Sequence, residues 1–507
     1  MSKPIGLNGI VIARNTRINF IAQIIPLLVA VVTIPLTVQG LGADRFGLIS
    51  LAWVMTGYMA IFDLGLGRAT TKFVAEFMSK GKSEEIPYIV WTAATVQVIL
   101  GIIGGLVLVG ITPLLVEQIL NIPEGLVNEA QTMLYLLASS VPIILLSGSF
   151  RGVLEALQRF DLMNAVQISG ASLTYLLPLI GLCLKLGVPG IVLLLLLARF
   201  VILISFIALD MRLIPGLKLF LPSLRLFPRL FSYGAWIMIT MIVNPILIYL
   251  DRFLIVSFLS LEMLTYYSIP YEALIRLQII PASLTITLFP AFSALEARGD
   301  RQRLTTFFAR SLKYILLIVG LFNILVALFG AEMIQLWLGT ELARESGKIL
   351  QILAIGVGIN CVAYIPSTLL SGAGRPDVPA KLHLLELPVY VGIAYFFMRR
   401  WGVTGAAWAW TFRVTLDALL LLCAALKIYR FSFDSFIVNG TALSAFLALA
   451  IVSLAYVLKA FLPFWHDAVG IVFSICVVGL FCWLSWKRVL DGSDKNLLLQ
   501  FLRIEGK

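Results

Sequence analysis

The sequence predicts an all-α polytopic membrane protein with about 14 transmembrane helices, built as two pseudo-symmetric six-helix lobes plus a C-terminal helix pair. Three observations lead to this fold class. The 507 residues are 60% hydrophobic and 13% charged, with a mean hydropathy of +1.00, whereas soluble domains average about 45–50% apolar and about 25% charged residues. Apolar runs of about 18 or more residues recur along the whole length. A segment near residue 160 is also matched by one about 216 residues later, an offset that fits parallel repeats of helices.

Reading the apolar runs against glycine, proline and charged breakers gives the individual spans. The first run follows a basic flank and is long enough to cross a bilayer, so we interpret it as a retained helix and not a signal peptide. The spans lie near residues 18–38, 46–66, 88–112, 130–148, 163–184, 188–209, 231–255, 264–289, 314–338, 348–371, 379–398, 402–426, 436–458 and 466–486.

The positive charges fix a predicted orientation. Of the 38 Lys and Arg residues, 27 fall in the N-terminus, the even-numbered loops and the C-terminus, and seven fall in the odd-numbered loops. Cytoplasmic loops of membrane proteins are enriched in Lys and Arg. We therefore expect both termini in the cytoplasm, and the net charge of +11 gives no reason to expect a nucleic-acid partner.

The repeat defines the predicted domains. "LEALQRFDLMNA" (154–165) aligns with "LSGAGRPDVPAK" (370–381), and "LGVPG" (186–190) is answered by "WGVTG" (401–405). The offset spans six helices, an even number, so both lobes should share one orientation. The predicted parts are an N-terminal lobe (1–209), a cytoplasmic linker (210–230), a C-terminal lobe (231–427) and an additional helix pair with a tail (428–507).

Polar residues form stripes inside the apolar spans. In spans seven and eight they recur at steps of 7, 4 and 7, which keeps them within about 20° of one line on a helix. A charge at the centre of a membrane helix costs about 2.5–3.5 kcal/mol, so such residues usually face protein or a water-filled cavity. The stripes are Tyr233, Thr240, Asn244 and Asp251, followed by Thr265, Glu272, Arg276 and Ser283.

Three charges in these stripes, together with Arg252 beside them, invite a functional interpretation. Asp251 and Arg252 are adjacent but about 100° apart on a helix, whereas Glu272 and Arg276 have the i,i+4 spacing of a direct ion pair. One interpretation is a closed network that joins the helices. The other is a lumen whose charges meet an anionic substrate or a coupling ion, and stripes on several helices favour it.

Further intramembrane charges have two open interpretations. Arg199 and Arg413 lie 214 residues apart, close to the repeat offset, and Arg413 has Asp417 at i+4. They either lock the packing of each lobe or line a lumen. Asp63 lies near the end of span two, where a helix-end role is favoured, and Glu386 and its neighbour His383 can be interpreted either way.

The pattern resembles a known family of transporters. The similarity rests on "LGADRFGLISL" (41–51) and "FDLGLGRATTKF" (62–73) in the first lobe, and on "YLDRFLIVSFLSLEMLTYYSIPYE" (249–272) and "LFPAFSAL" (288–295) in the second. Together with the span number and the repeat, these segments resemble polysaccharide (O-antigen type) flippases of the multidrug/oligosaccharidyl-lipid/polysaccharide exporter superfamily. The resemblance implies movement of undecaprenyl-pyrophosphate-linked oligosaccharide from the cytoplasmic to the outer leaflet of a bacterial inner membrane.

The resemblance also suggests roles for the polar stripes. Arginine offers a fixed fork of donors for a pyrophosphate, so the expected cargo-binding residues include two arginines. Coupling to a proton or Na+ gradient needs a titratable carboxylate. We expect a monomer without cofactors, with polysaccharide polymerase and chain-length-control proteins as partners. The expected residues are Arg252, Arg276, Asn244, Tyr249 and Tyr271 for cargo, and Asp251 and Glu272 for ion coupling.

Three other functions compete with this one. A multidrug or cation antiporter of the same superfamily would require an acidic, aromatic cavity, which Arg252 and Arg276 argue against. A peptidoglycan-precursor flippase would share the fourteen-span plan. A polysaccharide polymerase or ligase would need clustered catalytic residues in a large outer loop, and no such loop, nucleotide-binding loop or metal-ligand spacing occurs in this sequence. We therefore expect a transporter and not an enzyme.

Overall fold

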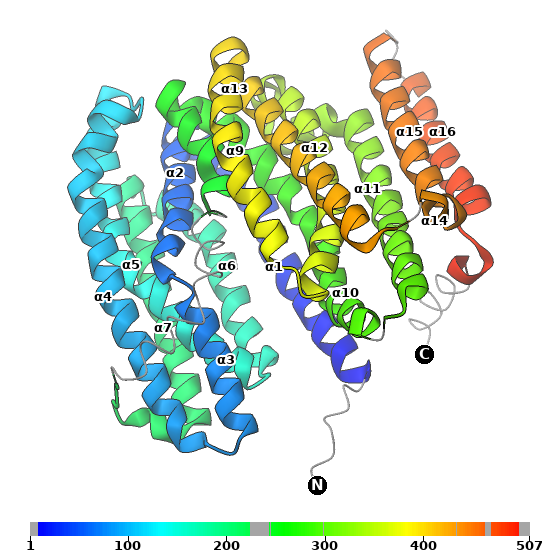
Figure 1. Cartoon of the computed structure of the whole chain (residues 1–507). Coiled ribbons are helices and arrows are strands. Elements are labelled where there is room, and N and C mark those ends of the chain that lie inside the picture. Colours follow the sequence, from blue (N-terminus) through cyan, green and yellow to red (C-terminus); the bar gives the residue numbers. More distant parts are fainter. Residues whose placement is uncertain are drawn as a thin grey trace. The chain divides into compact units, whose positions relative to one another are not determined.

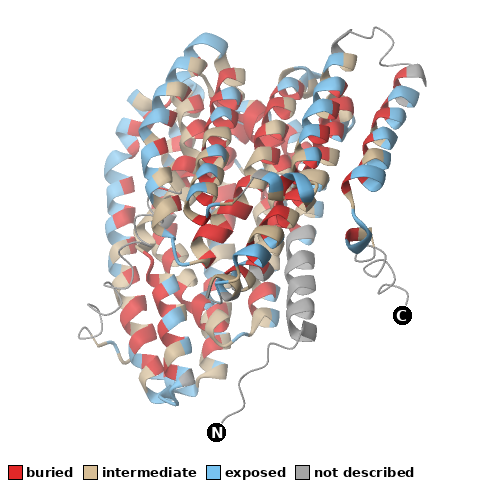
Figure 2. Ribbon diagram, turned by 45° about the vertical axis from the view of Figure 1, so that its right-hand side comes forward, coloured by how far each residue is buried: buried red, intermediate tan, exposed pale blue. Residues whose placement is uncertain are grey.

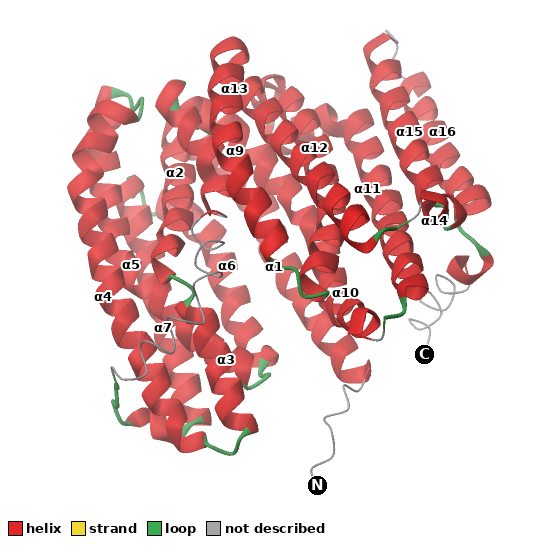
Figure 3. Ribbon diagram, viewed as in Figure 1, coloured by secondary structure: helices red, strands yellow, loops and turns green. Residues whose placement is uncertain are grey.

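The computed structural model describes residues 9–223, 243, 245–297, 299–431, 433–461 and 468–495. Throughout these residues the chain forms helices joined by short connections (Figures 1 and 3). Contacts divide it into two compact units. Unit 1 comprises Met1–Ile269 and Leu387–Ala406, and unit 2 comprises Pro270–Glu386 and Ala407–Lys507. The predicted lobe boundaries at 209 and 231 stay a prediction, because residues 224–242 lie outside the described residues.

Unit 1 is organised around one central helix, α5. Helices α2, α3, α4, α6 and α7 all pack against α5, and α1 packs against α6. Residues 245–258 are also helical. The helices are α1 (Gly9–Leu41), α2 (Ala43–Met59), α3 (Leu66–Ser79), α4 (Ile86–Leu114), α5 (Val127–Ala156), α6 (Phe160–Cys183), α7 (Val188–Leu213) and α9 (Leu261–Ile275), of which α9 continues into unit 2.

Small residues let α4 and α5 approach closely. A Cβ atom on Gly101 would lie 2.5 Å from Cα of Pro142, and one on Gly105 would lie 2.8 Å from the carbonyl oxygen of Ala138. Spaced i,i+4, the two glycines form the small-residue face that membrane helices use for packing, since burial from lipid adds no hydrophobic driving force. Large apolar side chains of α4 such as Leu106 are exposed, as expected of a surface in contact with lipid. Along many helices exposed residues (pale blue) alternate with buried ones (red) (Figure 2).

Unit 2 is organised around α11. This helix packs against α10, α12, α14, α15 and α16. A short 3-10 turn at Arg276–Gln278 separates α9 from α10. The helices are α10 (Ile279–Ala297), α11 (Arg301–Leu338), α12 (Thr340–Gly372), α13 (Asp377–Tyr429, which also crosses into unit 1), α14 (Phe433–Val438), α15 (Thr441–Phe461) and α16 (Ala468–Leu484).

The all-helical membrane fold is confirmed, but the count of about 14 spans is not. The described residues contain 10 helices that are long and apolar enough to cross a membrane. They correspond to predicted spans two to six and nine to fourteen. Two of the predicted spans lie within α13, which breaks at Gly402 (φ 58°, ψ −137°). The residues predicted for span eight are divided between α9 and α10 by the 3-10 turn.

The local structure repeats at the offset predicted from the sequence. The turn after α5 has Gln158 at φ 56°, and the turn after α12 has Gly374 at φ 84°. Backbone N–H groups of Arg159 and Arg375 donate to Leu154 and Leu370 at 2.9 and 2.8 Å. In both turns the arginine then pairs with the aspartate two residues later: Arg159 with Asp161 at 2.9 Å and Arg375 with Asp377 at 3.1 Å.

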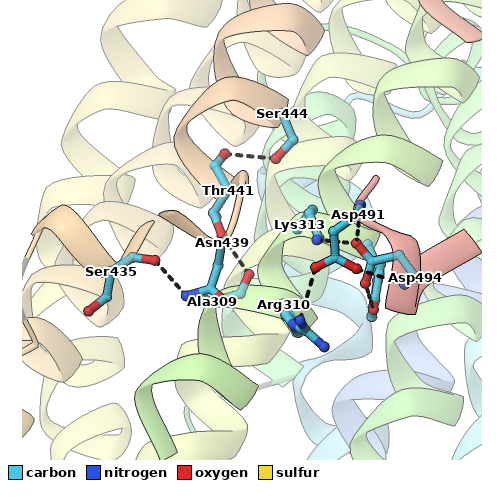
Figure 4. A network of polar contacts seen from close by, with 10 residues as sticks. Ala309, Arg310, Lys313, Ser435, Asn439, Thr441, Ser444, Asp491 and Asp494 are labelled. Atoms are coloured by element: carbon cyan, nitrogen blue, oxygen red, sulfur yellow. Dashed lines mark hydrogen bonds and ion pairs between the residues drawn. The ribbon is translucent and has the colours of Figure 1, made fainter. Parts of the chain in front are cut away.

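A buried polar network attaches the segment that follows α16 to α11 (Figure 4). The contacts come from Asp491 and Asp494, and we call residues 490–495 the C-terminal segment. Lys313 is paired with Asp494, and both are 1% exposed. Tyr314 also donates to Asp494, at 2.5 Å, and Arg310 pairs with Asp491 at 2.9 Å. Thr441, at the start of α15, donates to the carbonyl oxygen of Ala309 at 2.7 Å. Both ends of the additional helix pair are thus tied to the same stretch of α11.

Candidate functional site

Asp251 is buried in a polar contact within unit 1. It lies on the helical residues 245–258 and is 0% exposed. The hydroxyl group of Tyr267 on α9, also 0% exposed, donates a hydrogen bond to its carboxylate. A buried carboxylate requires such donors, because burial without them is costly. The structure therefore places Asp251 in a polar contact between two helices, and its role in ion coupling stays a prediction.

Arg252 lies against aromatic rings. It is 4% exposed, and its guanidinium carbon lies 5.3 Å from the ring centroid of Tyr249, a cation–π distance. Tyr249 packs on α2 at Gly57, where a Cβ atom would come within 2.1 Å of the ring, and edge-on to Tyr58 at 5.9 Å. The two neighbouring charges thus have different aromatic partners, Tyr267 for Asp251 and Tyr249 for Arg252.

Glu272 and Arg276 form the ion pair that their spacing predicts, in unit 2. Their oxygen and nitrogen atoms are 3.5 Å apart, and the side chains are 20% and 28% exposed. Tyr271 is 3% exposed and packs edge-on against Trp410 at 5.5 Å. This contact favours a packing role for Tyr271 over the cargo contact predicted from the sequence. Asn244 lies outside the described residues.

The segment after Arg276 carries polar contacts that the sequence analysis did not single out. Gln278 donates to Asn360 at 2.9 Å and accepts from the hydroxyl of Tyr364 at 3.2 Å. Further along, Thr285 on α10 and Thr368 on α12 lie 3.2 Å apart. A signal in the sequence is the spacing of four residues between Asn360, Tyr364 and Thr368, which places them on one face of α12.

Arg199 connects three helices of unit 1. Its guanidinium donates to Ser140 on α5 at 3.2 Å and to Thr56 on α2 at 3.0 Å. These contacts favour the packing interpretation for Arg199. Its counterpart Arg413 is 8% exposed and shares a helix with Asp417, 5% exposed, whose carboxylate lies 3.3 Å from Nε2 of His383.

Asp63 caps a helix, as expected from its position near the end of span two. Its carboxylate accepts from the backbone N–H of Gly67 at 3.4 Å, at the start of α3, and from Gln97 at 2.6 Å. A carboxylate at a helix N-terminus satisfies otherwise unpaired N–H groups. Beside it lies a cavity of about 450 Å³ in unit 1, into which Arg68 and Arg151 also project.

A second cavity, in unit 2, is apolar. It has a volume of about 410 Å³ and lies among α11, α12, the second half of α13 and α15. Asn323 and Thr415 are the polar side chains among its lining residues. Leu419 and Leu449, two of the lining residues, are 55% and 71% exposed, so the cavity is a groove open to the outside of the unit. We refer to it as the α11–α15 groove.

Comparison with known proteins identifies the fold. The structure is similar to the lipid II flippase MurJ in an inward closed conformation, with a TM-score of 0.69 and 16% identity over 94% of this chain and 100% of the other. An inward-facing multidrug resistance MATE family transporter of the MOP superfamily gives a TM-score of 0.68 and 16% identity over 80% and 98%. The chain therefore has the fold of multi-pass membrane transporters of this superfamily.

Sequence comparison identifies the family. A Shigella flexneri protein described as "Putative O-antigen transporter" is 28% identical over 413 residues, covering 81% of this chain and 96% of that protein. The family model described as polysaccharide biosynthesis protein matches residues 12–296, more than half of the 507 residues. The family resemblance seen in the sequence is thereby confirmed, and the chain belongs to the polysaccharide biosynthesis protein family.

Proposed function

We propose that this protein is a flippase that moves undecaprenyl-pyrophosphate-linked oligosaccharide repeat units from the cytoplasmic to the outer leaflet of a bacterial inner membrane. The observation that carries the proposal is the similarity to the described O-antigen transporter over 81% of this chain. In this proposal the two lobes alternate access to the cargo, both termini are cytoplasmic, and the cargo then becomes available for surface polysaccharide assembly.

The chemistry of the described residues suits each part of such a cargo. A pyrophosphate is a dense negative charge, and Arg276 offers a partly exposed guanidinium at the break between α9 and α10. Its pairing with Glu272 neutralises the arginine while no phosphate is present. The hydroxyl and amide groups of Gln278, Asn360 and Tyr364 form a polar surface of the kind that sugars require.

The α11–α15 groove suits the lipid portion. Its lining is almost wholly apolar and it opens outwards at Leu419 and Leu449. A polyprenyl chain could lie there without crossing polar surface, because burial of hydrocarbon against hydrocarbon leaves no polar group unsatisfied. In this proposal the tail stays in contact with lipid while the polar head passes through the protein.

The charges distinguish this proposal from its alternatives within the superfamily. An antiporter of cationic drugs would need an acidic cavity, and the partly exposed guanidinium of Arg276 argues against one, because it repels a cation. A peptidoglycan-precursor flippase would also carry a pyrophosphate, so charge does not separate the two, and the experiment must identify the accumulating lipid.

The test is to delete the gene and identify the lipid-linked sugars that accumulate. The proposal predicts that an undecaprenyl-pyrophosphate-linked oligosaccharide repeat unit builds up on the cytoplasmic side while surface polysaccharide disappears. Accumulation of the peptidoglycan precursor, with cell lysis, would assign the second function. Unchanged lipid pools together with increased sensitivity to cationic drugs would assign the antiporter.

A further inference from the structure

The break in α13 brings four ionisable side chains together inside unit 2. At Gly402 the backbone has φ 58°, so the two halves of α13 are separate helical legs. His383 and Glu386 are three residues apart on the first leg, and Arg413 and Asp417 are four apart on the second, so each pair shares one helix face. Nε2 of His383 lies 3.3 Å from Oδ1 of Asp417, which places the two faces against each other.

Three of these side chains are shielded from the surroundings. Glu386 is 1% exposed, Asp417 5% and Arg413 8%, whereas the side chain of His383 is 23% exposed. The carboxyl group of Glu386 lies close enough to the carboxyl group of Asp417 and to the guanidinium of Arg413 to interact with both. Among the residues that the structure describes, no N–H or alcohol group donates a hydrogen bond to either oxygen of Glu386.

Ionising the carboxyl groups of both Glu386 and Asp417 is energetically unfavourable in this arrangement. Two adjacent carboxylates in a shielded site repel each other, and such pairs hold one proton between them. With one shared proton, the pair carries a single negative charge, which Arg413 balances. Without the proton, the group of four has an uncompensated negative charge inside the membrane, which is unfavourable.

The site lies within a long apolar helix, and one of its members reaches the surface of the protein. Glu386 is nine residues from the start of α13 at Asp377, which corresponds to ~14 Å along the helix. His383 lies one turn closer to that end and is the most exposed of the four. The imidazole of His383, in contact with Asp417, can accept a proton on one ring nitrogen and release one from the other, which is the chemistry of a proton shuttle.

We propose that Glu386 and Asp417 form a proton-binding site that shares one proton, that His383 loads and unloads it, and that Arg413 keeps the loaded site neutral. The site deepens the proposed function, because the unfavourable charge of the unloaded state is a means of coupling the conformation of the transporter to the proton gradient. It assigns ion coupling to residues other than Asp251 and Glu272, the carboxylates that the sequence had suggested.

Infrared difference spectroscopy of the purified protein tests the site without any cargo. The wild type should show the carbonyl stretch of a protonated carboxyl group that disappears as the pH is raised. Glu386→Gln and Asp417→Asn should each abolish this band, since either leaves one carboxylate beside Arg413. The matched control Glu341→Gln removes an exposed carboxylate of α12 and should leave the band unchanged. His383→Ala should keep the band and slow its disappearance after a pH jump.

Two results would overturn the proposal. One is a band that persists in both Glu386→Gln and Asp417→Asn, provided that their thermal unfolding matches the wild type. The other is loss of the band on addition of Na+ at constant pH, which would make the ligand a sodium ion. The infrared measurement uses no lipid-linked sugar, so a negative result would overturn the proton site and not the flippase function. A negative result in the accumulation experiment would overturn the flippase function and not the proton site.

Discussion

The substitution Arg276→Ala tests whether Arg276 binds the cargo or only stabilises the fold. In the structure Arg276 makes an i,i+4 pair with Glu272 at 3.5 Å, and neither side chain is deeply buried. Pairs of this kind contribute about 0.3–0.5 kcal/mol to stability. The substitution should therefore leave the folded protein and its amount in the membrane close to normal.

The expected effect on transport is much larger. A charge-assisted hydrogen bond to a phosphate contributes about 1.5–3 kcal/mol. Each 1.4 kcal/mol corresponds to a factor of about ten, so the rate of flipping should fall about 10- to 100-fold. Arg276→Lys keeps the charge but loses the planar fork of donors, and should give an intermediate rate.

Complementation of a deletion strain measures both quantities. Surface polysaccharide is quantified beside the amount of protein in the membrane. Lys80→Ala is the matched control, because Lys80, directly after α3, makes an i,i+4 pair with Glu76 at 2.7 Å in a distant part of the sequence. Wild-type polysaccharide in Arg276→Ala cells would refute the cargo role, and loss of the protein itself would show a structural one.

Arg252→Ala should behave differently. Arg252 is 4% exposed and its guanidinium lies over the ring of Tyr249, so the substitution removes a buried cation–π contact worth about 2 kcal/mol and also leaves a cavity. We expect the protein to be lost from the membrane, so that Arg252 alone would not distinguish cargo binding from packing.

Three further predictions concern packing, pH and the lipid groove. Arg199→Ala removes two hydrogen bonds and should lower the unfolding free energy by about 1–3 kcal/mol in detergent without changing transport per molecule; lost transport at unchanged stability would contradict this. Burial alone would raise the pKa of Asp494, but hydrogen bonds from Lys313 and Tyr314 outweigh burial and hold this pKa below its usual value. The stability that these bonds contribute is therefore present above about pH 4 and lost as the pH falls through the lowered pKa. Proteolysis of the C-terminal segment should rise in the wild type only in that acid range and in Asp494→Asn already at neutral pH; release of the wild-type segment near neutral pH would refute this. Leu449→Trp narrows the open side of the α11–α15 groove and should reduce surface polysaccharide at normal protein level, while Leu454→Trp, on an exposed part of the same helix, should not. Equal effects of the two would exclude the groove as the place of the lipid tail.

The features predictable from the sequence are those set by local spacing. The i,i+4 pair of Glu272 and Arg276 and the paired turns at Arg159 and Arg375 follow from intervals of two to four residues and one repeat offset. Helix geometry fixes which of these side chains can meet. The same geometry correctly predicted that Asp251 and Arg252 lie on different faces of the helix and contact different partners.

Contacts between distant segments could not be predicted in this way. Lys313 and Asp494 are 181 residues apart, and nothing in either segment indicates the other. The Glu386 and Asp417 pair depends on the break at Gly402, which in the sequence is only one of 39 glycines. Arg199 and Arg413 looked equivalent at the repeat offset, but their partners come from other helices and differ between the two units.

Reconstitution gives the most direct test of the central claim. The purified chain would be placed in vesicles that contain the undecaprenyl-pyrophosphate-linked oligosaccharide isolated from the deletion strain, with an outward- or inward-directed proton gradient. An impermeant enzyme that cleaves the sugar would report how much reaches the opposite leaflet. We predict transfer that depends on the protein and is lost with Arg276→Ala. Transfer at the rate of protein-free vesicles, by a folded wild-type protein with the gradient in either direction, would contradict the flippase function.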